Sequence, residues 1–175
     1  MAIRGKPKKL NYDALWEYAL RALGQQAQSA GQIRQKLARR AETPSDIPAV
    51  LAKLREYNLV NDQKFSETFA TSRLQNQGFG RFRVMRDLQS KQVSGGIAKE
   101  AVEKTFAGTD ELALVQNFLV RKYRGKDLRE YLAEEKNLAS AYRRLRTAGF
   151  SSQSALKTLR RYTDRVEDFD EPAED

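Results

Sequence analysis

The sequence predicts an all-α protein made of three tandem three-helix repeats, stacked into an elongated and curved array. Apolar side chains recur three or four positions apart almost throughout the 175 residues, as they do in amphipathic helices. No stretch alternates polar and apolar residues over the length of a strand. Segments about fifty residues apart also resemble one another. A unit of that size barely buries a core alone, so we expect neighbouring units to share apolar faces.

Each repeat is predicted to begin with a longer helix, which two shorter helices follow. The longer helices carry apolar residues at Tyr12, Trp16, Ala19 and Leu23, at Phe65, Phe69 and Leu74, and at Leu112, Val115, Leu119 and Tyr123. The shorter helices carry them at Ile33 and Leu37, Ile47 to Leu54, Val84 to Leu88, Ile97 to Val102, Leu138 to Leu145, and Ala155 to Leu159. Short polar residues occupy the expected N-cap positions, namely Ser29, Asp46, Asp62, Ser94, Asp110 and Ser151. Glycines at 78, 125 and 149 lie where helices are expected to end.

The repeats align on Leu37, Leu88 and Leu145, so the period is 51 residues and then 57. The longer third copy contains an additional segment, residues 125–137, which can form one or two helical turns. We therefore expect a basic flexible arm over residues 1–10, repeats over 11–59, 60–107 and 108–162, and an acidic, disordered tail over 163–175. Short turns within each unit are typical of helix-turn-helix and homeodomain modules.

Charge is distributed unevenly along the chain. Lys and Arg number 32 against 23 Asp and Glu, a formal net charge of +9. Residues 164–175 carry seven acids and one base, which leaves +15 on residues 1–163. A body with that charge attracts polyanions or an acidic protein surface. The acidic end either keeps the protein soluble or competes with nucleic acid for the basic body.

Composition excludes most catalytic chemistry. The chain has no cysteine and no histidine, which removes disulfides, thiolate nucleophiles, the Ser-His-Asp triad and ordinary zinc sites. Gly78-Phe79-Gly80 lacks the strand and the third glycine of a nucleotide-binding loop. Paired carboxylates such as Glu100 and Glu103 fit exposed helix faces. We expect no catalytic residue, metal or cofactor, and we expect a cytoplasmic protein because no signal peptide or membrane-spanning stretch is recognisable.

Basic side chains are the strongest functional candidates, because arginine and lysine near helix ends suit phosphate or carboxylate contacts. The predicted binding residues are Arg81, Arg83, Arg86 and Lys91 in the second repeat, and Arg121, Arg124, Arg143 and Arg144 in the third. Arg83 has an alternative structural role, in which it joins parts of the repeat by contacting a helix terminus or an acid. Phe82 lies between arginines and either stacks on a base or partner, or packs between repeats.

The middle of the chain carries the most specific motifs. Leu59-Val60-Asn61-Asp62 is followed by Phe65 and Arg73, and a second block contains Gly78, Gly80, Arg83, Val84, Leu88, Lys91 and Val93. Together with residues 146–151, these motifs resemble the RecX family of regulatory proteins over roughly residues 12–162. Asn58 and Gln92 replace glycines of the family pattern, and Asp87 replaces a glutamate. Asparagine can adopt a left-handed conformation as glycine does. The 125–137 segment and the acidic end lie outside the pattern.

The resemblance implies a partner, the RecA recombinase assembled on single-stranded DNA. It implies a non-enzymatic monomer that binds RecA and its filaments and inhibits the ATPase, strand exchange and filament growth. Such a protein modulates recombinational repair and the SOS response, and it contacts single-stranded DNA through the filament or directly. Two alternatives remain at this point. One is an autonomous DNA-binding protein of helix-turn-helix type that acts without RecA, and the other is a scaffold whose charge meets an acidic protein.

Overall fold

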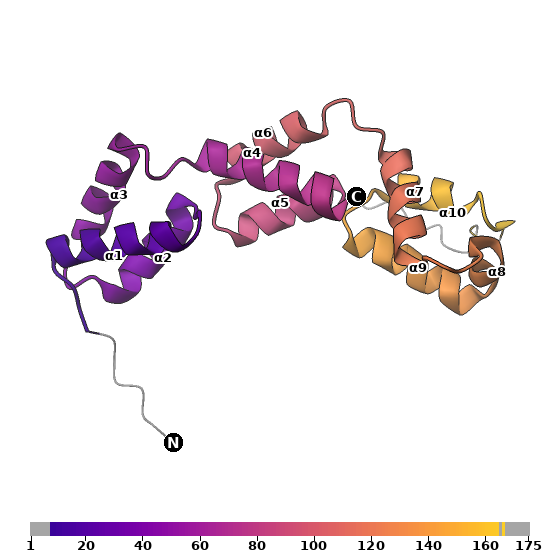
Figure 1. Cartoon of the computed structure of the whole chain (residues 1–175), viewed down its shortest axis with the longest axis horizontal. Helices are drawn as coiled ribbons and strands as arrows, with labels where there is room; N and C mark the ends of the chain where they lie inside the picture. Colours follow the sequence, from indigo (N-terminus) through magenta and orange to yellow (C-terminus); the bar gives the residue numbers. More distant parts are fainter. Residues whose placement is uncertain (1–7, 165, 167–175) are drawn as a thin grey trace, which may run out of the picture. The chain divides into compact units, whose positions relative to one another are not determined.

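A computed structural model describes residues 8–164 and 166, and this part of the chain is helical apart from its turns and one isolated bridge. Figure 1 shows the helices in chain order. They are α1 (Tyr12–Gln25), α2 (Ala30–Arg40), α3 (Asp46–Glu56), α4 (Asp62–Ser72), the π-helical segment η1 (Arg73–Gln77), α5 (Arg81–Ser90), α6 (Gly95–Phe106), α7 (Glu111–Lys122), α8 (Leu128–Ala133), α9 (Glu135–Thr147) and α10 (Ser152–Leu159). The predicted all-α class is confirmed. None of these helices is long and apolar enough to cross a bilayer.

The chain divides into two compact units. The first contains residues up to Phe69 together with Leu88–Ala101, and the second contains Ala70–Asp87 and the residues from Val102 onward. The division runs through α4, α5 and α6, so each of these helices contributes to both units.

The core of the first unit is built from α1, α2 and α3, which pack on one another. Leu15, Ile33, Leu37, Leu51 and Leu54 are almost completely buried. Lys53 covers one edge of this core, with its ammonium group 4.5 Å from the centroid of the Trp16 ring. Burial of the apolar stripe of each helix stabilises the unit, because the hydrophobic effect grows with the apolar area removed from water.

The core of the second unit is built from α7, α9 and α10, and α8 packs against α9. Leu119, Leu138, Leu145, Phe150 and Leu159 are fully or nearly fully buried there. The six-residue helix α8 lies within the 125–137 segment. The expectation of a longer first helix is wrong for this region, since α9 has 13 residues and α7 has 12.

Helix starts follow the sequence at three of the predicted N-caps. Ser29 forms a capping box with Gln32, Asp110 accepts from the amides of Leu112 and Ala113, and Ser151 accepts from that of Ser154. Asp46 and Asp62 are instead the first residues of their helices.

Asp62 turns away from its own helix and accepts the Ala30 amide of α2 at 2.7 Å, while Asn61 accepts the Lys64 amide. The Asp62 carboxylate therefore bonds to the distant amide of Ala30, and Asn61 takes over the local N-cap bond of α4.

Candidate functional site

Seven of the eight predicted binding residues belong to the second unit, and Lys91 belongs to the first. Three of the seven, Arg83, Arg143 and Arg144, line one cavity of about 380 Å³, which we call the basic cavity. Its lining is completed by Phe79, Phe118, Lys122, Ser140, Thr147 and Ala148. No acidic side chain is among these residues, so the lining combines positively charged side chains with apolar ones.

Three segments supply the cations of the basic cavity. Arg83 comes from the first turns of α5, Lys122 is the last residue of α7, and Arg143 and Arg144 are consecutive on α9. The Arg83 guanidinium carbon lies 5.1 Å from the centroid of the Phe79 ring, a cation–π arrangement. Phe118 packs edge-on against buried Phe150 at 5.5 Å between centroids. Cations around aromatic rings suit phosphates, carboxylates or bases.

The predicted set contains none of the other six lining residues, of which Lys122 adds a charge and Phe79 lies against Arg83. A signal for Lys122 is present in the sequence, because Phe118 and Lys122 are four residues apart and therefore share a helix face. Phe79 has no comparable signal, since it lies in the connection between η1 and α5.

Arg83 also has the structural role considered as its alternative. Its Nε lies 3.0 Å from Asp87 Oδ1, and its Nη1 lies 3.4 Å from the Thr147 carbonyl oxygen. Arg86 donates from Nη2 to the same carbonyl oxygen at 3.2 Å. Both arginines thus meet the C-terminus of α9, where unpaired carbonyls carry partial negative charge. Arg83 therefore stabilises the fold through its contacts with Asp87 and the Thr147 carbonyl, in addition to lining the basic cavity.

The remaining predicted residues are dispersed. Arg121 donates to the Gln77 carbonyl at the end of η1 and lies over the Phe118 ring. Arg81 lies 5.9 Å from the centroid of the Phe106 ring. Arg124 lines a different cavity, of about 440 Å³, with Lys126 and Arg129. In the first unit, the backbone carbonyl of Lys91 accepts the Ser29 hydroxyl.

A close backbone crossing positions the start of α5 against the α9–α10 connection. The Gly80 amide donates to the Ala148 carbonyl at 2.9 Å, and the Phe82 amide donates to the Gly149 carbonyl at 3.2 Å. A Cβ on either Gly80 or Gly149 would lie less than 3.0 Å from backbone atoms of the other segment. Only glycine permits this approach, and the approach places Arg83 and Arg86 at the end of α9.

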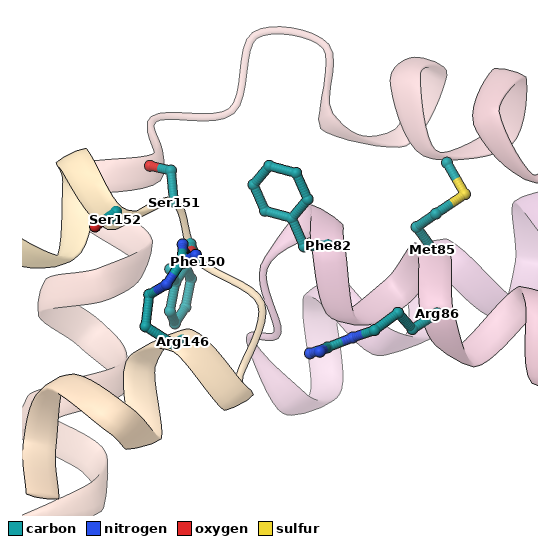
Figure 2. A pocket seen from close by; sticks show the side chains of 7 residues that line it. All are labelled: Phe82, Met85, Arg86, Arg146, Phe150, Ser151 and Ser152. Atoms are coloured by element: carbon teal, nitrogen blue, oxygen red, sulfur yellow. Dashed lines mark hydrogen bonds between the residues drawn. The ribbon is translucent and has the colours of Figure 1, made fainter. Parts of the chain in front are cut away.

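A second cavity of about 480 Å³ lies beside this crossing, and we call it the Phe82 cavity. It is lined by Phe82, Met85, Arg86, Arg146, Phe150, Ser151 and Ser152. Figure 2 shows Phe82 and Arg86 projecting from α5 toward the group formed by Arg146, Phe150 and Ser151. The Phe82 side chain is 53% exposed, whereas Phe150 is fully buried. Arg146 donates from Nη1 to the Phe150 carbonyl at 3.1 Å.

Glu111 holds the start of α10 next to this cavity. Its carboxylate accepts the Ser151 amide at 3.0 Å and the hydroxyls of Ser151 and Ser154 at 2.7 and 2.6 Å. Burial alone would raise the pKa of Glu111, but the bonds from Ser154 and Ser151 and the charge of Arg81 together lower the pKa below its ordinary value. The carboxylate is therefore a structural cap for the helix. Carboxylates nowhere gather into a group of three that could hold a metal ion within the described residues.

Comparison with known proteins identifies related chains. Residues 16–54 match the model of the first three-helix domain of RecX, and residues 61–102 match that of the second. The regulatory protein RecX of Chromohalobacter salexigens is 32% identical over 124 residues, which cover 70% of this chain and 80% of the relative. That of Halorhodospira halophila is 32% identical over 111 residues, covering 63% of this chain and 67% of the relative.

Solved structures agree on the fold. A crystal structure of RecX from Lactobacillus salivarius matches with a TM-score of 0.64 at 18% identity, covering 86% of this chain and 96% of the other. A second crystal structure, of a regulatory protein RecX, matches with a TM-score of 0.68 at 20% identity, covering 86% and 73%. At these identities the structures establish the shared fold. Because the sequence relationship extends over most of a curated relative, the chain belongs to the RecX family of non-enzymatic regulatory proteins.

Proposed function

We propose that this protein binds the RecA recombinase and RecA filaments on single-stranded DNA, and that it inhibits the ATPase, strand exchange and filament growth. In this way it modulates recombinational repair and the SOS response. Membership of the RecX family supports RecA as the partner. The basic cavity is the single structural observation that carries the proposal, because its lining contains four cations from three segments and no acidic side chain.

The chemistry of the basic cavity suits both components of such a filament. Arg143 and Arg144 are exposed on α9, and their guanidinium groups can pair with phosphate oxygens of DNA or with carboxylates of RecA. Contacts of this kind are individually weak, but contacts to several sites on one filament add through effective concentration. A protein that binds one nucleotide state of the filament better than another shifts filament assembly toward the favoured state.

The test is RecA ATPase activity on single-stranded DNA at fixed salt while the protein is titrated in. We compare the wild type with the double variant Arg143→Gln/Arg144→Gln, which removes two charges from the basic cavity. The matched control is Arg160→Gln/Arg161→Gln, which removes two charges from exposed arginines that do not line it. We expect the cavity variant to require about tenfold more protein for half inhibition, and the control to stay within twofold of the wild type.

Two outcomes would contradict this proposal. Equal weakening in both variants would mean that net charge acts without a specific site. No effect of the wild type on RecA, combined with a preference of about a thousandfold for a defined duplex, would favour an autonomous DNA-binding protein. If the basic cavity binds DNA directly, each arginine removed should reduce the magnitude of the slope of log affinity against log salt concentration by about one.

A further inference from the structure

The Phe82 cavity has a counterpart in the first unit, and the difference between the two is informative. The counterpart is a cavity of about 610 Å³ whose lining includes Gly31, Arg34, Gln35, Gln89, Val93 and Ser94. With the repeat periods of 51 and 57 residues, these six positions correspond in order to Phe82, Met85, Arg86, Arg146, Phe150 and Ser151. Six of the seven residues that line the Phe82 cavity are thus repeat equivalents of residues around the first.

The counterpart shows that an aromatic ring is not needed to build this crossing. Gly31 occupies the position of Phe82, and a Cβ on Gly31 would lie less than 3.0 Å from the carbonyl oxygen of Gln92. In the first unit, the start of α2 at Gly31 therefore approaches the α5–α6 connection at Gln92 closely, with no side chain at position 31. The Phe82 ring is 53% exposed, so it is neither required for the crossing nor used to fill the core.

The residues around Phe82 indicate which kind of ligand the cavity suits. Arg86 and Arg146 line the cavity with it, and no acidic side chain does, whereas Asp62 lines the counterpart. Each arginine uses one of its nitrogens on a backbone carbonyl, Arg86 on Thr147 and Arg146 on Phe150. A guanidinium has five N–H donors, so both retain donors for a ligand. An exposed aromatic ring that lines one cavity with two arginines is a combination that binds single-stranded nucleic acid, where bases stack and phosphates pair with arginine.

We propose that the Phe82 cavity binds one base of a single-stranded nucleic acid, with the base stacked on Phe82 and the flanking phosphates paired with Arg86 and Arg146. This inference deepens the proposed function and rests on it, because it gives the protein its own contact with the single strand. An apolar segment of a protein partner is the competing occupant, and titration with oligo-dT and with RecA separates the two.

The experiment places a fluorescent reporter at the stacking position. The chain has a single tryptophan, Trp16, so the double variant Trp16→Phe/Phe82→Trp carries its only indole in the Phe82 cavity. Titration with oligo-dT in the absence of RecA should quench this indole saturably, because thymine stacks on the ring. The matched control is Trp16→Phe/Tyr57→Trp, since Tyr57 is 60% exposed in the first unit and outside both cavities. We expect no quenching of the control at the same oligonucleotide concentrations.

A second measurement uses the fluorescence anisotropy of a labelled oligonucleotide. Phe82→Ala should weaken binding about tenfold, and Phe82→Tyr, which keeps the ring, should stay within twofold of the wild type. Binding without quenching at position 82, or equal binding by Phe82→Ala and the wild type, would overturn the inference. Quenching by RecA but not by oligo-dT would assign the cavity to a protein segment and overturn it as well.

Failure of this inference and failure of the proposed function can be distinguished. If oligo-dT leaves the fluorescence of the indole at position 82 unchanged while inhibition of the RecA ATPase is normal, base stacking is refuted and the proposed function stays intact. Saturable quenching by oligo-dT, together with no effect of the wild type on RecA, would support the nucleic-acid site and refute the proposed function.

Discussion

The close crossing in the first unit and that in the second are built on equivalent positions but secured by different groups. In the first, the Ser29 hydroxyl donates to the Lys91 carbonyl and the Asp62 carboxylate accepts the Ala30 amide. In the second, the backbone amide of Gly80 donates to Ala148, and Arg83 and Arg86 reach the Thr147 carbonyl.

The comparison separates the parts of a crossing that are required from those that vary. Ser29 and Gly80 are repeat equivalents, as are Lys91 and Ala148, so a donor to the same carbonyl is common to both crossings. The residue two positions further on differs between the two crossings. A Cβ on Gly31 would overlap the Gln92 carbonyl oxygen, whereas the second crossing accommodates Phe82 with its side chain 53% exposed. Specialised surfaces can therefore evolve on the second crossing without loss of the fold.

The largest effect is expected at Gly149. Gly149→Ala places a Cβ less than 3.0 Å from the Arg83 backbone and forces alanine to φ +90°. We expect a loss of about 3 kcal/mol in the free energy of unfolding, measured with urea. Gly108→Ala is the matched control, since it has φ +72° and nothing within 4 Å of the added Cβ. It should lose only about 1 kcal/mol, and equal losses would mean that the crossing contributes nothing.

The next effect concerns the first crossing. Gly31→Ala brings a Cβ against the Gln92 carbonyl oxygen at a residue without positive φ, so we expect a loss of about 2 kcal/mol from the steric overlap alone. Gly24→Ala, in α1 with open space around it, should instead gain about 0.5 kcal/mol. Urea unfolding of both variants measures the difference. An unchanged Gly31→Ala variant would show that the first crossing can separate without cost.

A smaller effect of opposite sign is expected at Gln92, which has φ +61° where Gly149 has φ +90°. Gln92→Gly makes the first crossing resemble the second and removes the left-handed strain of a side chain, so the protein should gain about 1 kcal/mol. Asn58→Gly, at φ +54°, should gain less because asparagine tolerates this conformation. Thermal and urea unfolding measure both gains in stability. A larger gain for Asn58→Gly than for Gln92→Gly would contradict the strain argument. Gln92→Gly should not rescue Gly31→Ala, since the carbonyl oxygen remains.

The smallest effect is a pH dependence confined to the second unit. The pKa of Glu111 is lower in the folded protein than its ordinary value of 4.5, so its contribution to stability is present above pH 4.5 and is lost as the pH falls through the folded pKa. Glu111→Gln should remove this part of the pH dependence. Unfolding free energies of the wild type and the variant, measured from pH 7 to pH 3, should converge at the acidic end. Parallel curves would assign the dependence to other carboxylates.

Helix formation could be predicted because its causes are local. The spacing of apolar residues indicates the all-α class, and Ser29, Asp110 and Ser151 cap their helices through bonds to residues two or three positions away. The left-handed conformation expected of Asn58 is also present, at φ +54°. The predicted N-cap failed at Asp62, because its carboxylate can accept either from amides of its own helix or from the amide of Ala30, 32 residues away, and it accepts from Ala30. The local spacing of residues does not indicate which of these amides the carboxylate will accept from.

The candidate site could be predicted in its residue types but not in its grouping. The sequence by itself determined a basic, helical chain and placed Arg143 and Arg144 on one helix, because charge and helical period depend on neighbouring residues. Only the tertiary structure decided that Arg83 joins them, since Thr147, 64 residues away, must first be brought to α5 by the glycine crossing. It likewise decided that Arg124 lies at another cavity. The physical reason is that a cavity is formed by side chains from segments distant in sequence, and the packing that brings them together is a property of the whole core.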